Sequence, residues 1–176
     1  MTINHIAANS ISRLLFFVAL AGFLSCQSDD KLTGVAAGAV GRYVVTAYIA
    51  SGDTLFSVLP GPAGYRPGIN KIGVTNFTIT LEATGSDQLT IKTDYWRKGS
   101  RFTFSKEVFV RLTNADYQFS LLKNRASSDY EGSVGRFTGF FYERTTGGIA
   151  IPLADSPINP NPSPLQDVVI IAQPGR

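Results

Sequence analysis

The chain has 176 residues, with 16 Lys or Arg and 13 Asp or Glu, so its formal charge is +3 at neutral pH. It contains one histidine, His5, and one cysteine, Cys26. Because positions after 26 hold neither residue type, they offer no His-based catalytic triad, no cysteine nucleophile and no zinc site of His and Cys. We therefore expect a protein that is not an enzyme, without catalytic residues, metal ligands or a cofactor.

An apolar run occupies residues 14–24, after Arg13 and a stretch without acidic residues. The run has 11 residues, whereas a membrane-spanning helix takes about 20. It also lacks the polar face that a helix at the protein surface would carry. These properties are typical of a signal peptide. We predict a signal peptide over residues 1–25 and export of the protein.

The predicted signal peptide ends in the sequence Phe23-Leu24-Ser25-Cys26. This sequence resembles the lipobox of bacterial lipoproteins, in which a small residue precedes a cysteine that carries lipid and becomes the N-terminus after cleavage. The resemblance implies lipidation of Cys26 and an anchor in the outer membrane, since two or more acyl chains hold a protein stably. Residues 26–40 would then form a flexible tether, because residues 34–40 are uncharged and mostly small.

The tether begins with a short polar and acidic segment, Gln27-Ser28-Asp29-Asp30. This segment resembles the export signal of surface-exposed lipoproteins in the Bacteroidetes group. The resemblance implies that the anchored domain faces the cell surface. A solvated tether that is simply acidic has the same composition, so a domain that faces the periplasm remains the alternative.

From Gly41 onward the hydrophobic residues recur with a period of two, which is typical of β-strands. The clearest strand has Phe77, Ile79 and Leu81 on one face. Strands of this kind number about eight to ten, with turn signals between them. We predict a single all-β domain over residues 41–176, an antiparallel up-and-down barrel of about eight strands, with an antiparallel β-sandwich as the alternative.

Several segments carry more specific predictions. Tyr43, Val45, Ala47 and Ile49 should share one face of the first strand, and Lys106, which interrupts an apolar face, should mark a bulge or bend. The proline-rich residues 60–68 should lie outside the sheet. Aromatic residues of both parities over 137–142 predict a strand covered on both sides, and residues 168–171 predict a closing or central strand.

The first predicted strand begins with Gly41-Arg42-Tyr43. This tripeptide resembles the Gly-x-Trp/Tyr opening of lipocalin-like barrels, and a tethered β-meander is similar in layout to the lipocalin-like domains of bacterial lipoproteins. The resemblance implies a barrel that binds a small apolar ligand. An eight-stranded barrel is just wide enough for one such ligand. The alternative is that the 12 Phe residues of the chain fill the interior.

A candidate binding surface lies in the segment 94–101, which contains the only tryptophan. Its aromatic faces and cationic donors are typical of surfaces that bind carbohydrates or anions. The alternative is a hairpin in which the tyrosine belongs to the core and the basic side chains are solvated. The candidate residues are Tyr95, Trp96, Arg97 and Arg101.

Carboxylates beside basic residues are interpreted as surface ion pairs. Asp94 lies close in sequence to Arg97 and Arg101, and Glu143 precedes Arg144. Basic residues are spread along the chain, so nucleic acid is not an expected partner.

These observations lead to two hypotheses for the function. In the first, a membrane-anchored envelope lipoprotein carries a non-catalytic β-barrel that binds a small apolar or carbohydrate ligand. In the second, a structural or interaction lipoprotein docks another envelope protein and has no ligand pocket. A pocket lined by Phe and Tyr at one barrel end would favour the first hypothesis, and a filled interior the second.

Overall fold

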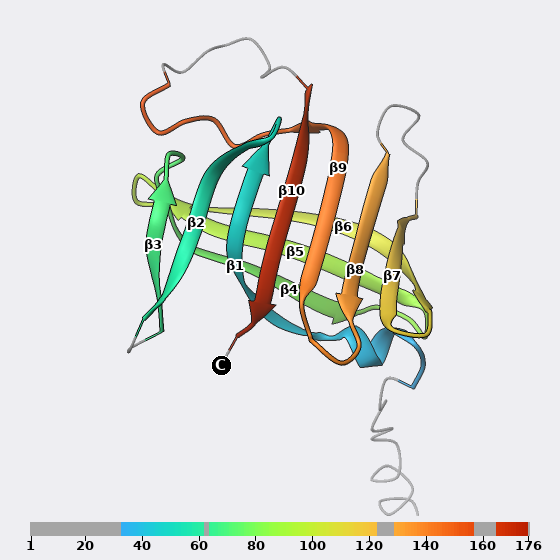
Figure 1. The fold of residues 1–176 in the computed structure, drawn as a ribbon. Helices are drawn as coiled ribbons and strands as arrows, with labels where there is room; N and C mark the ends of the chain where they lie inside the picture. Colours follow the sequence, from blue (N-terminus) through green and yellow to red (C-terminus); the bar gives the residue numbers. More distant parts are fainter. Residues whose placement is uncertain (1–32, 62–63, 123–128, 157–164, 176) are drawn as a thin grey trace, which may run out of the picture. The chain divides into compact units, whose positions relative to one another are not determined.

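The computed structural model describes residues 33–61, 64–122, 129–156 and 165–175 (Figure 1). The predicted signal peptide and Cys26 lie outside these residues. The described elements are a 3-10 helix and ten β-strands. They are η1 (Ala36–Ala39), β1 (Gly41–Ala50), β2 (Asp53–Gly61), β3 (Gly64–Asn70), β4 (Val74–Ala83), β5 (Gln88–Arg97), β6 (Ser100–Leu112), β7 (Asp116–Leu121), β8 (Tyr130–Gly135), β9 (Phe141–Ile149) and β10 (Leu165–Pro174).

Eight strands form a closed antiparallel barrel. From β4 to β10 each strand pairs with the next one along the chain, and β10 pairs with β1, which in turn pairs with β4. Strands β4, β5 and β6 cross behind β8, β9 and β10 at a steep angle (Figure 1). The predicted up-and-down barrel is thus confirmed, and β10, which contains the apolar run 168–171, is the strand that closes it.

The strands β2 and β3 form a hairpin that branches from β1. The first part of β1, Gly41–Val44, pairs with β4, and its last part, Ala47–Ala50, pairs with β2. The hairpin therefore leaves the barrel wall where β1 changes its partner. It lies at the left in Figure 1.

The prediction that residues 60–68 lie outside the sheet is wrong. Pro60 of β2 pairs with Tyr65 of β3, and Val58 pairs with Pro67. The only described partner of β3 is β2. Proline is compatible with such an edge strand, because its missing N–H can face the unpaired side.

The prediction of one face for β1 fails in the middle of the strand. The pairing of β1 with β10 shifts between Val45 and Ala47. Beyond this irregularity Tyr48 and Ala50 are buried, whereas Ala47 and Ile49 are only partly buried. A bulge adds one residue to a strand and so exchanges its two faces.

One end of the barrel is covered by η1. Ala36 and Ala39 are buried, and the N–H of Ala36 donates a hydrogen bond of 3.0 Å to the carbonyl oxygen of Ser86, in the turn between β4 and β5. Gly34 has a φ of 141° and lies so close to Ser86 that a Cβ would collide with its backbone. The structure thus differs from the flexible tether expected for residues 34–40, because small side chains let this segment pack closely on the barrel.

The antiparallel order places alternate turns at opposite ends of the barrel. The η1 end comprises η1 and residues 84–87, 113–115 and 136–140, and the far end comprises residues 51–52, 71–73, 98–99 and 150–156. The helix η1 and the turn between β8 and β9 both lie at the lower end of the barrel in Figure 1.

Candidate functional site

The register between β5 and β6 identifies the side chains that face the barrel interior. The two strands pair without a shift, so Phe102 lies opposite Tyr95 and Lys106 lies opposite Ile91. Tyr95 and Ile91 are buried. Because side chains alternate along a strand, Phe102, Phe104 and Lys106 share the inner face. The bulge predicted at Lys106 is therefore wrong, and Lys106 points into the barrel.

Two phenylalanines of this inner face are solvent-exposed. Phe102 and Phe104 expose 40% and 55% of their surface, and the buried ring of Tyr95 stacks on them with centroid distances of 5.3 and 6.0 Å. The strand β7 pairs only with residues 108–112 of β6, so the other half of β6 has one described neighbour, β5. Solvent thus reaches the inner face at the far end. We call Tyr95, Phe102 and Phe104 the aromatic rim.

A short segment after β9 covers another part of the far end. The N–H of Ile151 donates to the hydroxyl of Tyr48 over 2.9 Å, and the N–H of Ala154 donates to the carbonyl oxygen of Lys71 over 2.9 Å. These bonds hold residues 150–156 against β1 and against the turn before β4. Phe102 and Phe104 of the aromatic rim stay exposed beside them.

A charged pair lies next to the aromatic rim, one inner position further into the barrel. Lys106 forms a salt bridge with Glu143 of β9, and their side chains expose 31% and 4% of their surface, respectively. The hydroxyl of Tyr130 in β8 donates a 3.5 Å hydrogen bond to Oε2 of Glu143. The ammonium of Lys106 lies 5.2 Å from the centre of the Tyr130 ring. We call these three residues the interior polar cluster.

The sequence interpretation of Glu143 as a surface residue paired with Arg144 is wrong. Glu143 is buried on the inner face, and Arg144 points outward, where it forms a 3.0 Å salt bridge with Asp167 of β10. A signal for the cluster was present, because Lys106 occupies an apolar parity. The missing information was its partner, which only the closure of the barrel brings close.

Burying the charges of the interior polar cluster costs about as much free energy as their attraction returns, so the cluster adds little to the stability of the fold. Removing a carboxylate from water costs several kcal/mol, and an apolar pair of similar size is often at least as stable. Burial, followed by the charge of Glu143, raises the pKa of Tyr130 well above its ordinary value, so this phenol keeps its proton. Ionisable groups inside a largely apolar site are typical of binding and catalytic sites.

Lys106 retains hydrogen-bonding capacity toward the rim. An ammonium group has three donors, and among the described residues Glu143 accepts one hydrogen bond from it. Its side chain is partly exposed, and on β6 it is the next inner residue after Phe104. A group that accepts these donors carries a lone pair, most commonly on oxygen.

The four candidate residues of the segment 94–101 lie on two faces. Tyr95 belongs to the aromatic rim, and Arg97, on the same parity, donates a 2.8 Å hydrogen bond to the carbonyl oxygen of Leu153. Trp96 and Arg101 lie opposite each other on the outer face, and both are exposed. The barrel wall therefore separates the first pair from the second.

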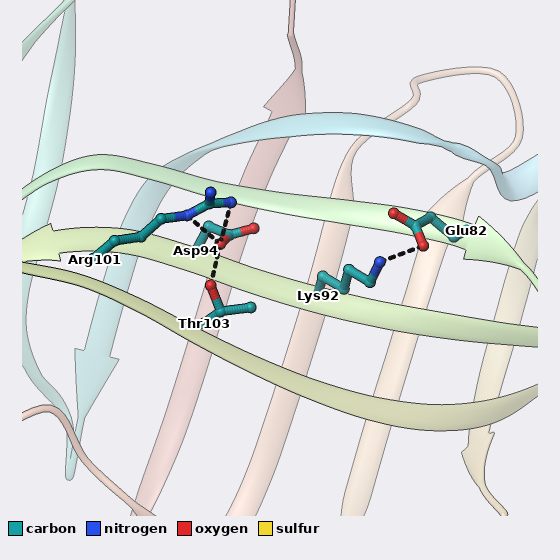
Figure 2. Close-up of polar contacts among 5 residues, drawn as sticks. All are labelled: Glu82, Lys92, Asp94, Arg101 and Thr103. Carbon is teal, nitrogen blue, oxygen red and sulfur yellow. Dashed lines mark hydrogen bonds and ion pairs between the residues drawn. The ribbon is translucent and has the colours of Figure 1, made fainter.

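The charged side chains of this outer face bind one another, as Figure 2 shows. Asp94 accepts hydrogen bonds from Arg101 at 2.8 Å and from Thr103 at 2.6 Å, which confirms the expected ion pair. Lys92 and Glu82 form a second pair at 2.5 Å. The hydrogen bond from Thr103, followed by the contact with Arg101, holds the pKa of Asp94 below its ordinary value. Exposed pairs of this kind contribute little energy, so we interpret the face as a solvated surface.

In the described ranges, no three or more His, Cys, Asp or Glu side chains lie together in a way that could hold a metal ion. None of the described helices has the length and apolar character needed to cross a membrane. No protein-family model matches the chain, and no curated protein matches it.

Proposed function

We propose that the protein is a non-catalytic envelope lipoprotein whose barrel binds a small ligand at the far end. The observation that carries the proposal is the aromatic rim, where Phe102 and Phe104 lie on the inner face and are nevertheless exposed. Covering apolar surface yields about 25 cal/mol for each Å² removed from water. A ligand with an apolar body therefore gains binding energy at this place.

The interior polar cluster supports a ligand with a polar end. Lys106 is the next inner residue of β6 after Phe104, so a molecule that covers the rim brings its inner end close to the ammonium. The complementary group is an oxygen acceptor, such as a carboxylate, a carbonyl or a hydroxyl. The apolar body of such an amphiphile would cover the aromatic rim, and its polar end would accept a hydrogen bond from Lys106. A sugar ring would make the same two contacts through its apolar face and its hydroxyls.

The location of the protein is proposed from the sequence. The lipobox-like sequence that ends at Cys26 supports a lipid anchor in the outer membrane, since several acyl chains attach a protein stably. The polar and acidic residues 27–30 support an orientation toward the cell surface, with the periplasmic face as the alternative.

The binding proposal is tested with the full chain and the fluorescent probe anilinonaphthalene sulfonate, which has an apolar body and an anionic group. We expect the probe to bind, and native mass spectrometry to detect a small molecule retained from the cells. Phe104→Ala should weaken probe binding about tenfold, since truncating an aromatic anchor of a binding site typically costs more than 1 kcal/mol.

The matched control is Phe109→Ala, because Phe109 lies on the outer face of the same strand and is similarly exposed. This variant should bind the probe like the wild type. Absence of probe binding, or equal losses in both variants, would contradict the proposal and favour the interaction lipoprotein without a ligand.

A further inference from the structure

The η1 end of the barrel exposes apolar side chains. Phe137, in the turn between β8 and β9, is 81% exposed, and Phe140 and Val40 at the same end are also exposed. The prediction that the aromatic residues over 137–142 are covered on both sides is thus wrong, because only Phe141 among the phenylalanines there is buried. Single exposed apolar residues are common. Whether Phe137 has a binding role therefore depends on how rigid the turn is and on what lies near it.

The turn that carries Phe137 is held firmly by backbone hydrogen bonds. The N–H of Gly135 donates to the carbonyl oxygen of Phe140 over 2.9 Å, and the N–H of Gly139 donates to that of Gly135 over 2.8 Å. The N–H of Arg136 donates over 2.8 Å to Ala115, in the neighbouring turn. A fixed turn therefore presents the ring of Phe137 outward.

The electrostatic character of the η1 end is weak. Arg136 lies with its guanidinium 5.6 Å from the centre of the Phe137 ring, and Arg42 is exposed at the same end, but so is Asp87. Whatever binds this end must therefore gain more from apolar contact than from charge.

The chain itself indicates what lies close to this end. The described residues begin at Thr33, three positions before the first residue of η1, so the chain enters the barrel at the η1 end. Cys26 precedes Thr33 by seven positions, a length that spans at most about 25 Å when fully extended. A lipid on Cys26 would therefore hold Thr33 within about 25 Å of the bilayer surface.

We propose that the η1 end is a membrane-docking face. In it, Phe137 and Phe140 enter the interfacial layer of the bilayer that holds the lipid of Cys26, and Arg136 contacts lipid phosphates. Aromatic residues are favoured at this interface. A tethered face also needs little affinity of its own, because the tether sets a high effective concentration. The inference rests on the proposed anchor, and it places the aromatic rim on the side away from the membrane.

The test uses tryptophan fluorescence in the protein as the cell processes it, reconstituted into vesicles of phosphatidylethanolamine and phosphatidylglycerol with brominated acyl chains. Trp96 is the only tryptophan, so Trp96→Phe provides a silent background. Phe137→Trp reports on the η1 end, and Ile149→Trp is the matched control, since Ile149 is highly exposed near the far end.

We expect brominated lipids to quench Phe137→Trp at least threefold more strongly than Ile149→Trp, with blue-shifted emission from the former only. High salt should leave the difference intact, because the contact is mainly apolar. Protein that stays with the vesicles while both tryptophans are equally unquenched would overturn the docking face and leave the anchor standing. Protein that lacks acyl chains by intact mass and separates from the vesicles would overturn the anchor, and the docking face with it.

Discussion

Lys106 on β6 forms a salt bridge inside the barrel with Glu143 on β9, a residue 37 positions further along the chain. The pair joins two strands that are not neighbours in the sheet. It therefore crosses the interior and provides the polar end of the proposed binding site.

The first prediction concerns the stability of this pair. Lys106→Met leaves the carboxylate of Glu143 buried without its partner, which should lower the free energy of unfolding by about 3 to 5 kcal/mol. The double variant Lys106→Met/Glu143→Leu should recover most of this loss, because both charges are gone. Chemical denaturation of the three proteins measures the effect. A double variant as unstable as the single one would contradict the account.

The second prediction concerns the ligand's polar group. In Lys106→Met/Glu143→Leu the affinity for anilinonaphthalene sulfonate should fall about tenfold or more, since a hydrogen bond to a charged group contributes about 1.5 to 3 kcal/mol. The affinity for the uncharged probe phenylnaphthylamine should stay the same or rise. Fluorescence titrations measure both affinities. Equal changes for the two probes would show that the ammonium does not recognise the acceptor.

The third prediction concerns the packing of η1. Gly34→Ala combines a left-handed φ with a collision against the backbone of Ser86, and should destabilise the protein by about 2 to 3 kcal/mol. Gly64→Ala is the control, because Gly64 also has a positive φ but open space around it. It should cost about 1 kcal/mol. Hydrogen exchange at the amide of Ala36 should accelerate in Gly34→Ala only.

The fourth prediction concerns alkaline pH. Burial raises the pKa of Tyr48 to about 12, whereas the ordinary value is 10.0. The unfolded chain therefore loses this proton first, and the contribution of Tyr48 to stability is present below pH 10 and is lost as the pH rises toward 12. The slope is about 1.4 kcal/mol for each pH unit. Tyr48→Phe should show a correspondingly shallower decline between these values in pH-dependent denaturation, and an unchanged slope would contradict the assignment.

Much of the barrel could be predicted from the sequence, because a period of two determines which side chains share a face. The alternation of Phe77, Ile79 and Leu81 locates a strand without any knowledge of its neighbours. The same rule fails in β1, since a bulge leaves no clear mark in the sequence. At Lys106 the rule of alternation holds, because the side chain lies on the inner face. The prediction of a bulge or bend there departs from the rule and is wrong.

The candidate site was harder to predict for a physical reason. A charged residue inside a barrel is stable only with a partner, and Glu143 becomes that partner only when β6 and β9 face each other across the closed barrel. Of the residues chosen from the sequence, Tyr95 belongs to the aromatic rim, while Trp96 and Arg101 lie on the outer face. Alternation alone separates these neighbours, but it does not tell which face is the inner one.

The edge strand β3 has a consequence for how copies of the protein behave when they meet at high concentration. An open sheet edge is a template on which a second chain can extend the ladder and begin to aggregate. In β3, Pro67 supplies no N–H to such a ladder and Arg66 adds an exposed charge. The two residues thus discourage strand addition on β3, the outer strand of the β2–β3 hairpin.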